Sequence, residues 1–269
     1  MILLGFIALI GPGCGSTLAR NGQADRLYEL AGVPGQISAL VEAVALYAAE
    51  QAGGLDLGPG RRLRVAISAT AEPSAVDAVA RASFASDWQR DAAQTALHWY
   101  TSPTGERMRD LELRANEVDW DAALSDFVDE IIREPVPLHR VALLARLAEA
   151  TQAAESTAEL ETGVARIVLR GVQILVSGDA STDDADLFLR LSAVYDGAIG
   201  RSRMQESIVF QFVYYAASDE EIEQYVLFAE SPAGQWIIAR DRAALAAAVD
   251  WLERRLRGLL EEAQPSAAA

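Results

Sequence analysis

The 269-residue chain has no lysine, a single cysteine and only two histidines. One cysteine cannot form an intramolecular disulfide, and a zinc site needs three or four histidine, cysteine or acidic ligands at recognisable spacing. His98 and His139 lie in different predicted helices, and no G-x-S-x-G sequence accompanies either of them. A Walker-type phosphate loop is also missing. The sequence therefore predicts no catalytic residue, no metal and no cofactor.

Positive charge is scarce as well. The net charge is −16, and every basic residue is an arginine. Binding to nucleic acid needs a basic patch, but the densest basic run, ERRLRG at 253–258, is typical of a solvated helix face. The acidity also disfavours adhesion to anionic lipid. Nucleic acid is thus excluded as a partner, and we expect contact with a membrane only through an N-terminal lipid anchor.

Long apolar runs are missing except at the extreme N-terminus. Residues 2–10 form an apolar segment with the length of a signal-peptide core, too short to span a bilayer. The sequence GPGCGS follows and resembles the lipobox of bacterial lipoproteins, which implies cleavage before Cys14 and lipidation of its thiol. An ordinary signal cleaved after Ala19 is the alternative. We expect 1–19 to direct export to the periplasm, with Cys14 as the anchor of a lipoprotein.

Glycine and proline are sparse in the long middle stretches, where alanine and leucine dominate. This composition favours helices, and apolar residues recur at helical spacing, so we expect an all-α multi-helix bundle. LRVAISA at 63–69 alternates like a short strand, although no partner strand is evident, and 53–62 has the composition of a loop. The prolines within 133–137 mark the best internal boundary. The tail at 263–269 is expected to be disordered.

One short phrase occurs twice, as WYTSPTGER at 99–107 and as FAESPAGQW at 228–236. Proline suits the first position of a helix, and serine before it is a good N-cap, so the phrase ends one helix and starts the next. Glycine at the third helical position suggests close approach of another backbone or an aromatic ring. An anion site at the helix N-terminus is the functional alternative. We predict structural corners formed by Trp99, Ser102, Pro103 and Gly105, and by Phe228, Ser231, Pro232 and Gly234.

A similar order of predicted helices surrounds the phrase each time, so we expect two related helical units at 23–133 and 138–262. The pattern EEIEQYVLFAESPAG at 220–234, with an apolar helix after it, resembles the bacterial exported family called domain of unknown function 2059. The resemblance is best over about 140–250, and the first half looks like a degenerate copy with TALHWYTSPTGERM. It implies an exported bacterial protein, and it assigns no activity and no catalytic residue.

The leading interpretation is a non-catalytic helical module for interaction or assembly with an envelope protein. The first alternative is a periplasmic binder or carrier of lipid or another apolar ligand, because helical bundles rich in aromatic residues can open an interior pocket. The second is a hydrolase with an unrecognised carboxylate site. With 39 aspartates and glutamates in the chain, spacing alone cannot single out a pair of carboxylates.

Overall fold

The protein is helical throughout the part of the chain that the structure, a computed structural model, describes. That part is residues 13–115, 120–177 and 184–262, in which twelve α-helices and no β-strand occur. The prediction of an all-α multi-helix bundle is therefore confirmed. The helices are α1 (Gly13–Leu30), α2 (Val33–Gly53), α3 (Leu57–Thr70), α4 (Pro73–Phe84), α5 (Arg90–Tyr100), α6 (Pro103–Ala115), α7 (Trp120–Arg133), α8 (Leu138–Thr151), α9 (Ala153–Ser177), α10 (Asp184–Val213), α11 (Asp219–Glu230) and α12 (Pro232–Glu262).

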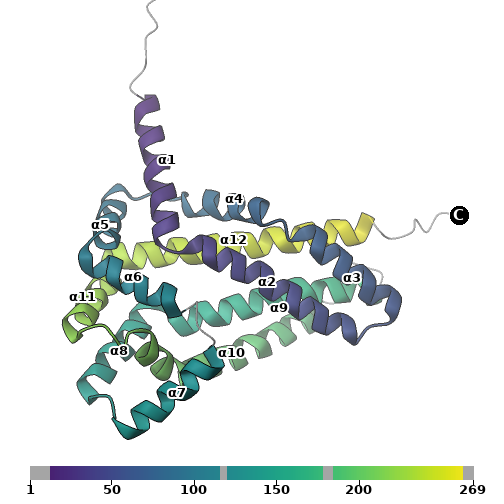
Figure 1. The fold of residues 1–269 in the computed structure, drawn as a ribbon. Coiled ribbons are helices and arrows are strands. Elements are labelled where there is room, and N and C mark those ends of the chain that lie inside the picture. The colour runs from purple at the N-terminus through teal and green to yellow at the C-terminus, as the bar shows by residue number, and fades with distance from the viewer. Residues whose placement is uncertain (1–12, 116–119, 178–183, 263–269) are drawn as a thin grey trace, which may run out of the picture.

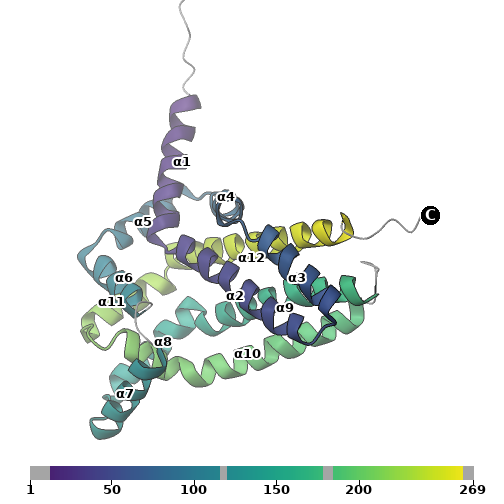
Figure 2. The ribbon, with the colours of Figure 1, turned by 45° about the vertical axis from the view of Figure 1, so that its right-hand side comes forward.

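Helix α12 is the central element of the fold. It packs between α4 and α9, and α10 covers the other side of α9, so that α4, α12, α9 and α10 follow one another from top to bottom in Figure 1. Helices α2 and α3 cross these layers and contact both α9 and α12, as Figure 2 shows from a second direction. Helix α1 projects from the bundle, while α7 lies at its opposite end.

Several helix starts follow rules that are visible in the sequence. A capping box opens α11: the Ser218 hydroxyl accepts a hydrogen bond from the Glu221 N–H at 3.2 Å, and the Glu221 carboxylate accepts one from the Ser218 N–H at 2.7 Å. Between α1 and α2, Gly32 adopts a left-handed conformation with φ of 78°, which glycine reaches without steric cost. Local sequence thus defines where these helices begin.

Buried apolar side chains form two clusters. The larger draws on α1 to α5 and on α9 and α12, and includes Leu27, Phe84 and Ile167. The smaller joins Met108 of α6 to side chains from α8, α11 and the end of α10. Both clusters combine residues from before and after the segment 133–137, where α7 ends and α8 begins. The two predicted units therefore share their cores instead of each enclosing one.

The segment 63–69, which the sequence left open between strand and helix, is helical, and the loop expected at 53–62 is too long. Helix α3 already begins at Leu57 and continues through this segment. In the alternating pattern, Val65 would share one face with Leu63 and Ile67. Its side chain is exposed, however, whereas theirs are buried. Without a partner strand, the segment instead buries one face of a helix against α2, α9 and α12. The buried residues are Gly60, Leu63, Ala66, Ile67 and Thr70.

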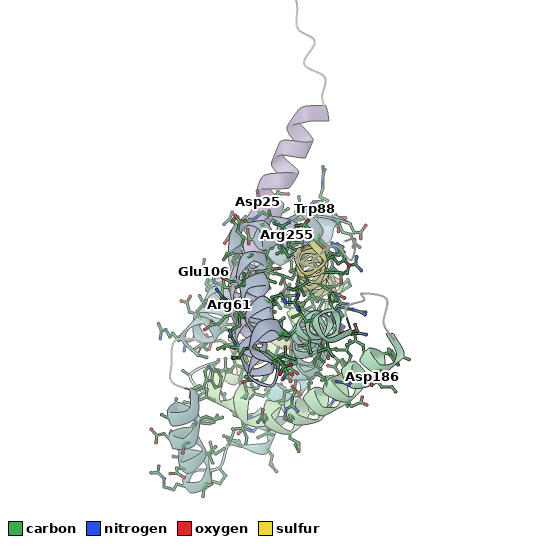
Figure 3. The ribbon with its side chains drawn as sticks, turned by 90° about the vertical axis from the view of Figure 1, so that its right-hand side faces the viewer. Asp25, Arg61, Trp88, Glu106, Asp186 and Arg255 are labelled. Atoms are coloured by element: carbon green, nitrogen blue, oxygen red, sulfur yellow. The ribbon has the colours of Figure 1, made fainter. Side chains whose placement is uncertain are left out.

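Charged side chains cover the outside of these layers. Arg61, Glu106 and Asp186 are exposed and lie on the periphery of the bundle in the end-on view of Figure 3. Among the described residues, no helix is by itself long and apolar enough to cross a membrane. The segments Gly22–Leu30 and Val33–Gly53 meet that length and composition only as a pair, which is bent by 61°.

Candidate functional site

The first Ser-Pro-x-Gly phrase forms a sharp corner between α5 and α6. The Ser102 hydroxyl accepts a hydrogen bond from the Gly105 N–H at 3.0 Å and donates one to the Trp99 carbonyl at 2.7 Å. A Cβ atom added at Gly105 would overlap the carbonyl oxygen of Trp99. The serine therefore caps α6, as predicted, and the glycine allows the end of α5 to approach the first turn of α6.

The second phrase repeats this geometry between α11 and α12. The Ser231 hydroxyl accepts from the Gly234 N–H at 3.1 Å and donates to the Phe228 carbonyl at 2.6 Å. The two corners also touch: the rings of Phe228 and Trp99 stack with centroids 4.8 Å apart and planes inclined by 12°. Stacking of this kind favours association beyond the area it buries. The aromatic positions of the two phrases therefore join the corners to each other.

This contact brings two carboxylates to equivalent places. Glu112 stands ten residues after Ser102 on α6, and Asp241 stands ten residues after Ser231 on α12. Both helices start at the proline that follows the serine, so the two acids occupy the same position on the third turn of their helices. The corners lie together at the left of Figure 1, from which α6 and α12 extend. Sequence reasoning missed this pair.

Glu112 and Asp241 both line one cavity of about 530 Å³. Its walls come from the α1–α2 junction and from α2, α5, α6, α9, α11 and α12, with one residue from the end of α8. Tyr100 and Tyr225 are among the lining residues, and so are Arg109 and Arg242. A cavity of this size suits a small molecule, and its convergent polar groups are typical of a binding site.

Glu112 is held by two tyrosines. Its Oε1 accepts hydrogen bonds from the hydroxyls of Tyr214 at 2.7 Å and Tyr225 at 3.1 Å. Burial raises the pKa of Glu112, whereas the two tyrosine hydroxyls and the nearby Arg109 charge lower it. Burial likewise raises the pKa of Tyr214 and Tyr225 well above 10, helped by the Glu112 charge. Both tyrosines therefore remain protonated hydrogen-bond donors at neutral pH.

Asp241 is less well satisfied. Gln36 of α2 approaches its Oδ2 at 3.5 Å, at the limit of a hydrogen bond, and its buried Oδ1 has no hydrogen-bond partner within the described chain. The pKa of Asp241 is raised to about 7, mainly by burial and in part by the charge of Glu112, while the contact with Gln36 opposes the shift. The cavity thus combines two carboxyl groups, one of which exchanges its proton near neutral pH.

The remaining sequence candidates lie elsewhere. His98 on α5 is exposed, and His139 on α8 is bound to Asp219 at 2.5 Å outside the cavity. No group of three or more histidine, cysteine, aspartate or glutamate side chains that could hold a metal occurs in the described ranges. Cys14 falls within α1, where the side chain is not among those described, and segments 1–12 and 263–269 lie outside the described residues.

A second hollow is apolar in character. It has a volume of about 500 Å³ and lies between α2, α9 and α10. Leu46, Val164 and Val194 are among its lining residues, and Leu46 is exposed. This groove is where an apolar ligand, the first alternative from the sequence, would be accommodated.

Comparison with protein-family models, with curated proteins and with solved structures gives no match to this chain. The resemblance to the family called domain of unknown function 2059, the export segment and the internal duplication therefore stay predictions. Functional inference rests on the cavity and on the two corners that build it.

Proposed function

We propose that this chain is a non-catalytic helical protein of the bacterial cell envelope that binds a small molecule in the cavity between Glu112 and Asp241. The observation that supports it is the convergence of these two acids, from matching positions on α6 and α12, on one cavity of about 530 Å³. Enclosing an acid with an unpartnered oxygen costs stability. A structural corner between two helices needs no such group, whereas a binding site uses it.

The test is native mass spectrometry of the purified full chain, which detects a retained small molecule directly. Gly35 borders the cavity, and a Cβ added there would meet no atom within 4 Å. Gly35→Phe should therefore fold normally while its ring fills part of the cavity, and the retained molecule should be lost. Gly200→Phe on the exposed face of α10 is the matched control, because it adds the same ring in equally open space.

The two variants also separate the alternatives. A molecule retained equally by Gly35→Phe and Gly200→Phe would place binding elsewhere, with the groove between α2, α9 and α10 as the next candidate. If native chain purified from its own envelope retains no molecule, and no small molecule added in solution binds it, the binding function fails. The interaction or assembly role is then favoured, since it makes no use of the cavity.

A hydrolase is the second candidate function. General acid–base chemistry needs a group that exchanges its proton near neutral pH, and Asp241, with a pKa of about 7, meets that requirement beside the second carboxyl group of Glu112. The mass of the released molecule decides between the two functions. A ligand recovered unchanged after prolonged incubation with native chain supports binding, whereas conversion that stops in Asp241→Asn supports the hydrolase.

We place this function in the periplasm or at the membrane surface, through the export signal predicted from the sequence. Cys14→Ser should remove the predicted lipid, so the variant should move from the detergent phase to the aqueous phase and lose the mass of the acyl groups. A variant that fractionates and migrates like the native protein would contradict the lipoprotein proposal. Cleavage after Ala19 would then be the remaining route of export, and mass spectrometry of the N-terminus would identify it.

A further inference from the structure

Three groups in the cavity wall have bonding capacity that no described residue uses. Both tyrosine hydroxyls bind Oε1 of Glu112, and no described residue bonds to its Oε2. Among the described residues, Asp241 has no partner for its Oδ1 and only the long contact from Gln36. Arg109, one helical turn before Glu112, makes no hydrogen bond and no ion pair with any described residue. Two acceptors and one cationic donor thus border the same space.

Other charged groups of the wall are already engaged. The Glu29 carboxylate accepts a hydrogen bond from Arg81 at 2.7 Å. The guanidinium of Arg242 is bound to Glu159, with its Nε 2.9 Å from the carboxylate, and also to Gln152. These pairs leave Glu112, Asp241 and Arg109 as the groups through which a ligand would be recognised.

We infer that the ligand is a zwitterion that carries both an ammonium and a carboxylate group, as an amino acid does. This inference rests on the proposed binding function. The ammonium would lie between Glu112 and Asp241, beside the rings of Tyr100 and Tyr225, which attract cations. The ligand carboxylate would bind the guanidinium of Arg109, whose planar fork matches a carboxylate. A plain amine would leave the hydrogen-bond donors of Arg109 unused, and a plain acid would face two carboxylates.

The first experiment is a thermal-shift screen of the full chain against the twenty L-amino acids at millimolar concentration. A ligand that binds only the folded state raises the unfolding temperature, so at least one amino acid should raise it by several degrees. Calorimetry then compares that amino acid with its decarboxylated amine and its deaminated acid. Each analogue lacks one charge, and each should bind tenfold or more weakly than the amino acid.

Two variants assign the charges to their places. Arg109→Gln should weaken the amino acid tenfold or more and leave the amine analogue unchanged, because the amine has no carboxylate to lose. Asp241→Asn should weaken the amino acid and the amine but not the acid analogue, which then faces one carboxylate fewer. Arg114→Gln and Asp110→Asn are the matched controls, since both residues are exposed on α6 and neither lines the cavity. These controls should bind like the native chain.

Failure of this inference is distinguishable from failure of the binding function. Suppose that no amino acid binds, while native mass spectrometry shows another molecule that Gly35→Phe excludes. The inference that the ligand is a zwitterion is then wrong, and the cavity is still a binding site. Equal affinities for an amino acid and its amine would likewise overturn the role of Arg109. If neither amino acids nor retained molecules are found, both proposals fall.

Discussion

Gly234→Ala should destabilise the protein by about 3 kcal/mol or more, although alanine ordinarily stabilises a helix interior by about 0.5–1 kcal/mol relative to glycine. The reason is the corner between α11 and α12. A Cβ at Gly234 would overlap the carbonyl oxygen of Phe228 and would lie 2.7 Å from the carbonyl oxygen of Ala229. Both are backbone atoms, which cannot move aside without opening the corner. Gly105→Ala should have a similar effect, because its Cβ would overlap the carbonyl oxygen of Trp99.

Denaturation by urea measures these differences directly, with Gly200→Ala as the control. Gly200 is also helical, and a Cβ there would meet no atom within 4 Å, so this variant should be as stable as the native chain or slightly more stable. For a chain of this size, a loss of about 3 kcal/mol lowers the unfolding temperature by roughly 10 °C. Equal stabilities of Gly234→Ala and Gly200→Ala would show that the corner is looser than the structure describes.

Ser231→Ala separates the cap from the close approach at the same corner. It removes the hydroxyl that accepts from Gly234 and donates to the Phe228 carbonyl, but it introduces no overlap. A lost N-cap costs about 1 kcal/mol. Ser231→Ala should therefore be clearly less harmful than Gly234→Ala, and it should retain ligand binding. Complete loss of binding by a folded Ser231→Ala protein would mean that the corner belongs to the site.

The corners could be predicted from the sequence because their rules are local. Serine before proline caps a helix whatever surrounds it, and glycine at the third position indicates a close approach. The segment 63–69 could not be assigned in this way, since its alternating pattern fits a strand and its burial as a helix depends on neighbours that are distant in sequence. Tertiary packing decided between two local interpretations.

The acid pair depends even more on long-range packing. Glu112 and Asp241 are 129 residues apart, and they share a cavity because the stacked rings of Trp99 and Phe228 hold the two corners together. One signal for this pair was nevertheless present. Each acid follows the serine of its phrase by ten residues, so aligning the two phrases and reading onward pairs them. The predicted internal repeat thus contained the information that pairs these two acids, whereas the spacing of acidic residues alone did not.

Asp241→Asn should stabilise the protein increasingly as the pH rises from 5 to 8. The pKa of Asp241 is raised from 3.8 to about 7 in the folded chain. Between these values the folded state keeps a proton that the unfolded state has lost, so native stability falls by up to about 1.4 kcal/mol per pH unit. Below pH 3.8 both states are protonated, and above pH 7 the penalty is constant. Asparagine has the shape of the neutral acid and does not titrate.

The measurement is the difference in unfolding free energy between Asp241→Asn and the native chain across that pH range. Subtraction cancels the titrating groups whose pKa does not depend on Asp241. The ionisable groups that share the cavity with Asp241 are Glu29, Tyr100, Arg109, Glu112, Tyr225 and Arg242. The difference should grow by roughly 2–3 kcal/mol between pH 5 and 8. Asp110→Asn, which removes an exposed charge on α6, is the control for net charge. A difference that stays flat for Asp241→Asn would show that its carboxyl group is already ionised at pH 5.

Measuring the ligand affinity of Asp241→Asn, in addition to its stability, tests whether the acid at this position serves binding. A purely structural corner does not need a buried carboxyl group that lowers stability at neutral pH, because asparagine would fill the same space without the penalty. A binding site needs the charge at the moment when an ammonium group arrives. Asp241→Asn should therefore be more stable than the native chain at pH 8 and bind the amino acid tenfold or more weakly. Greater stability with unchanged binding would separate Asp241 from the site and leave Glu112 as the acceptor of the ammonium.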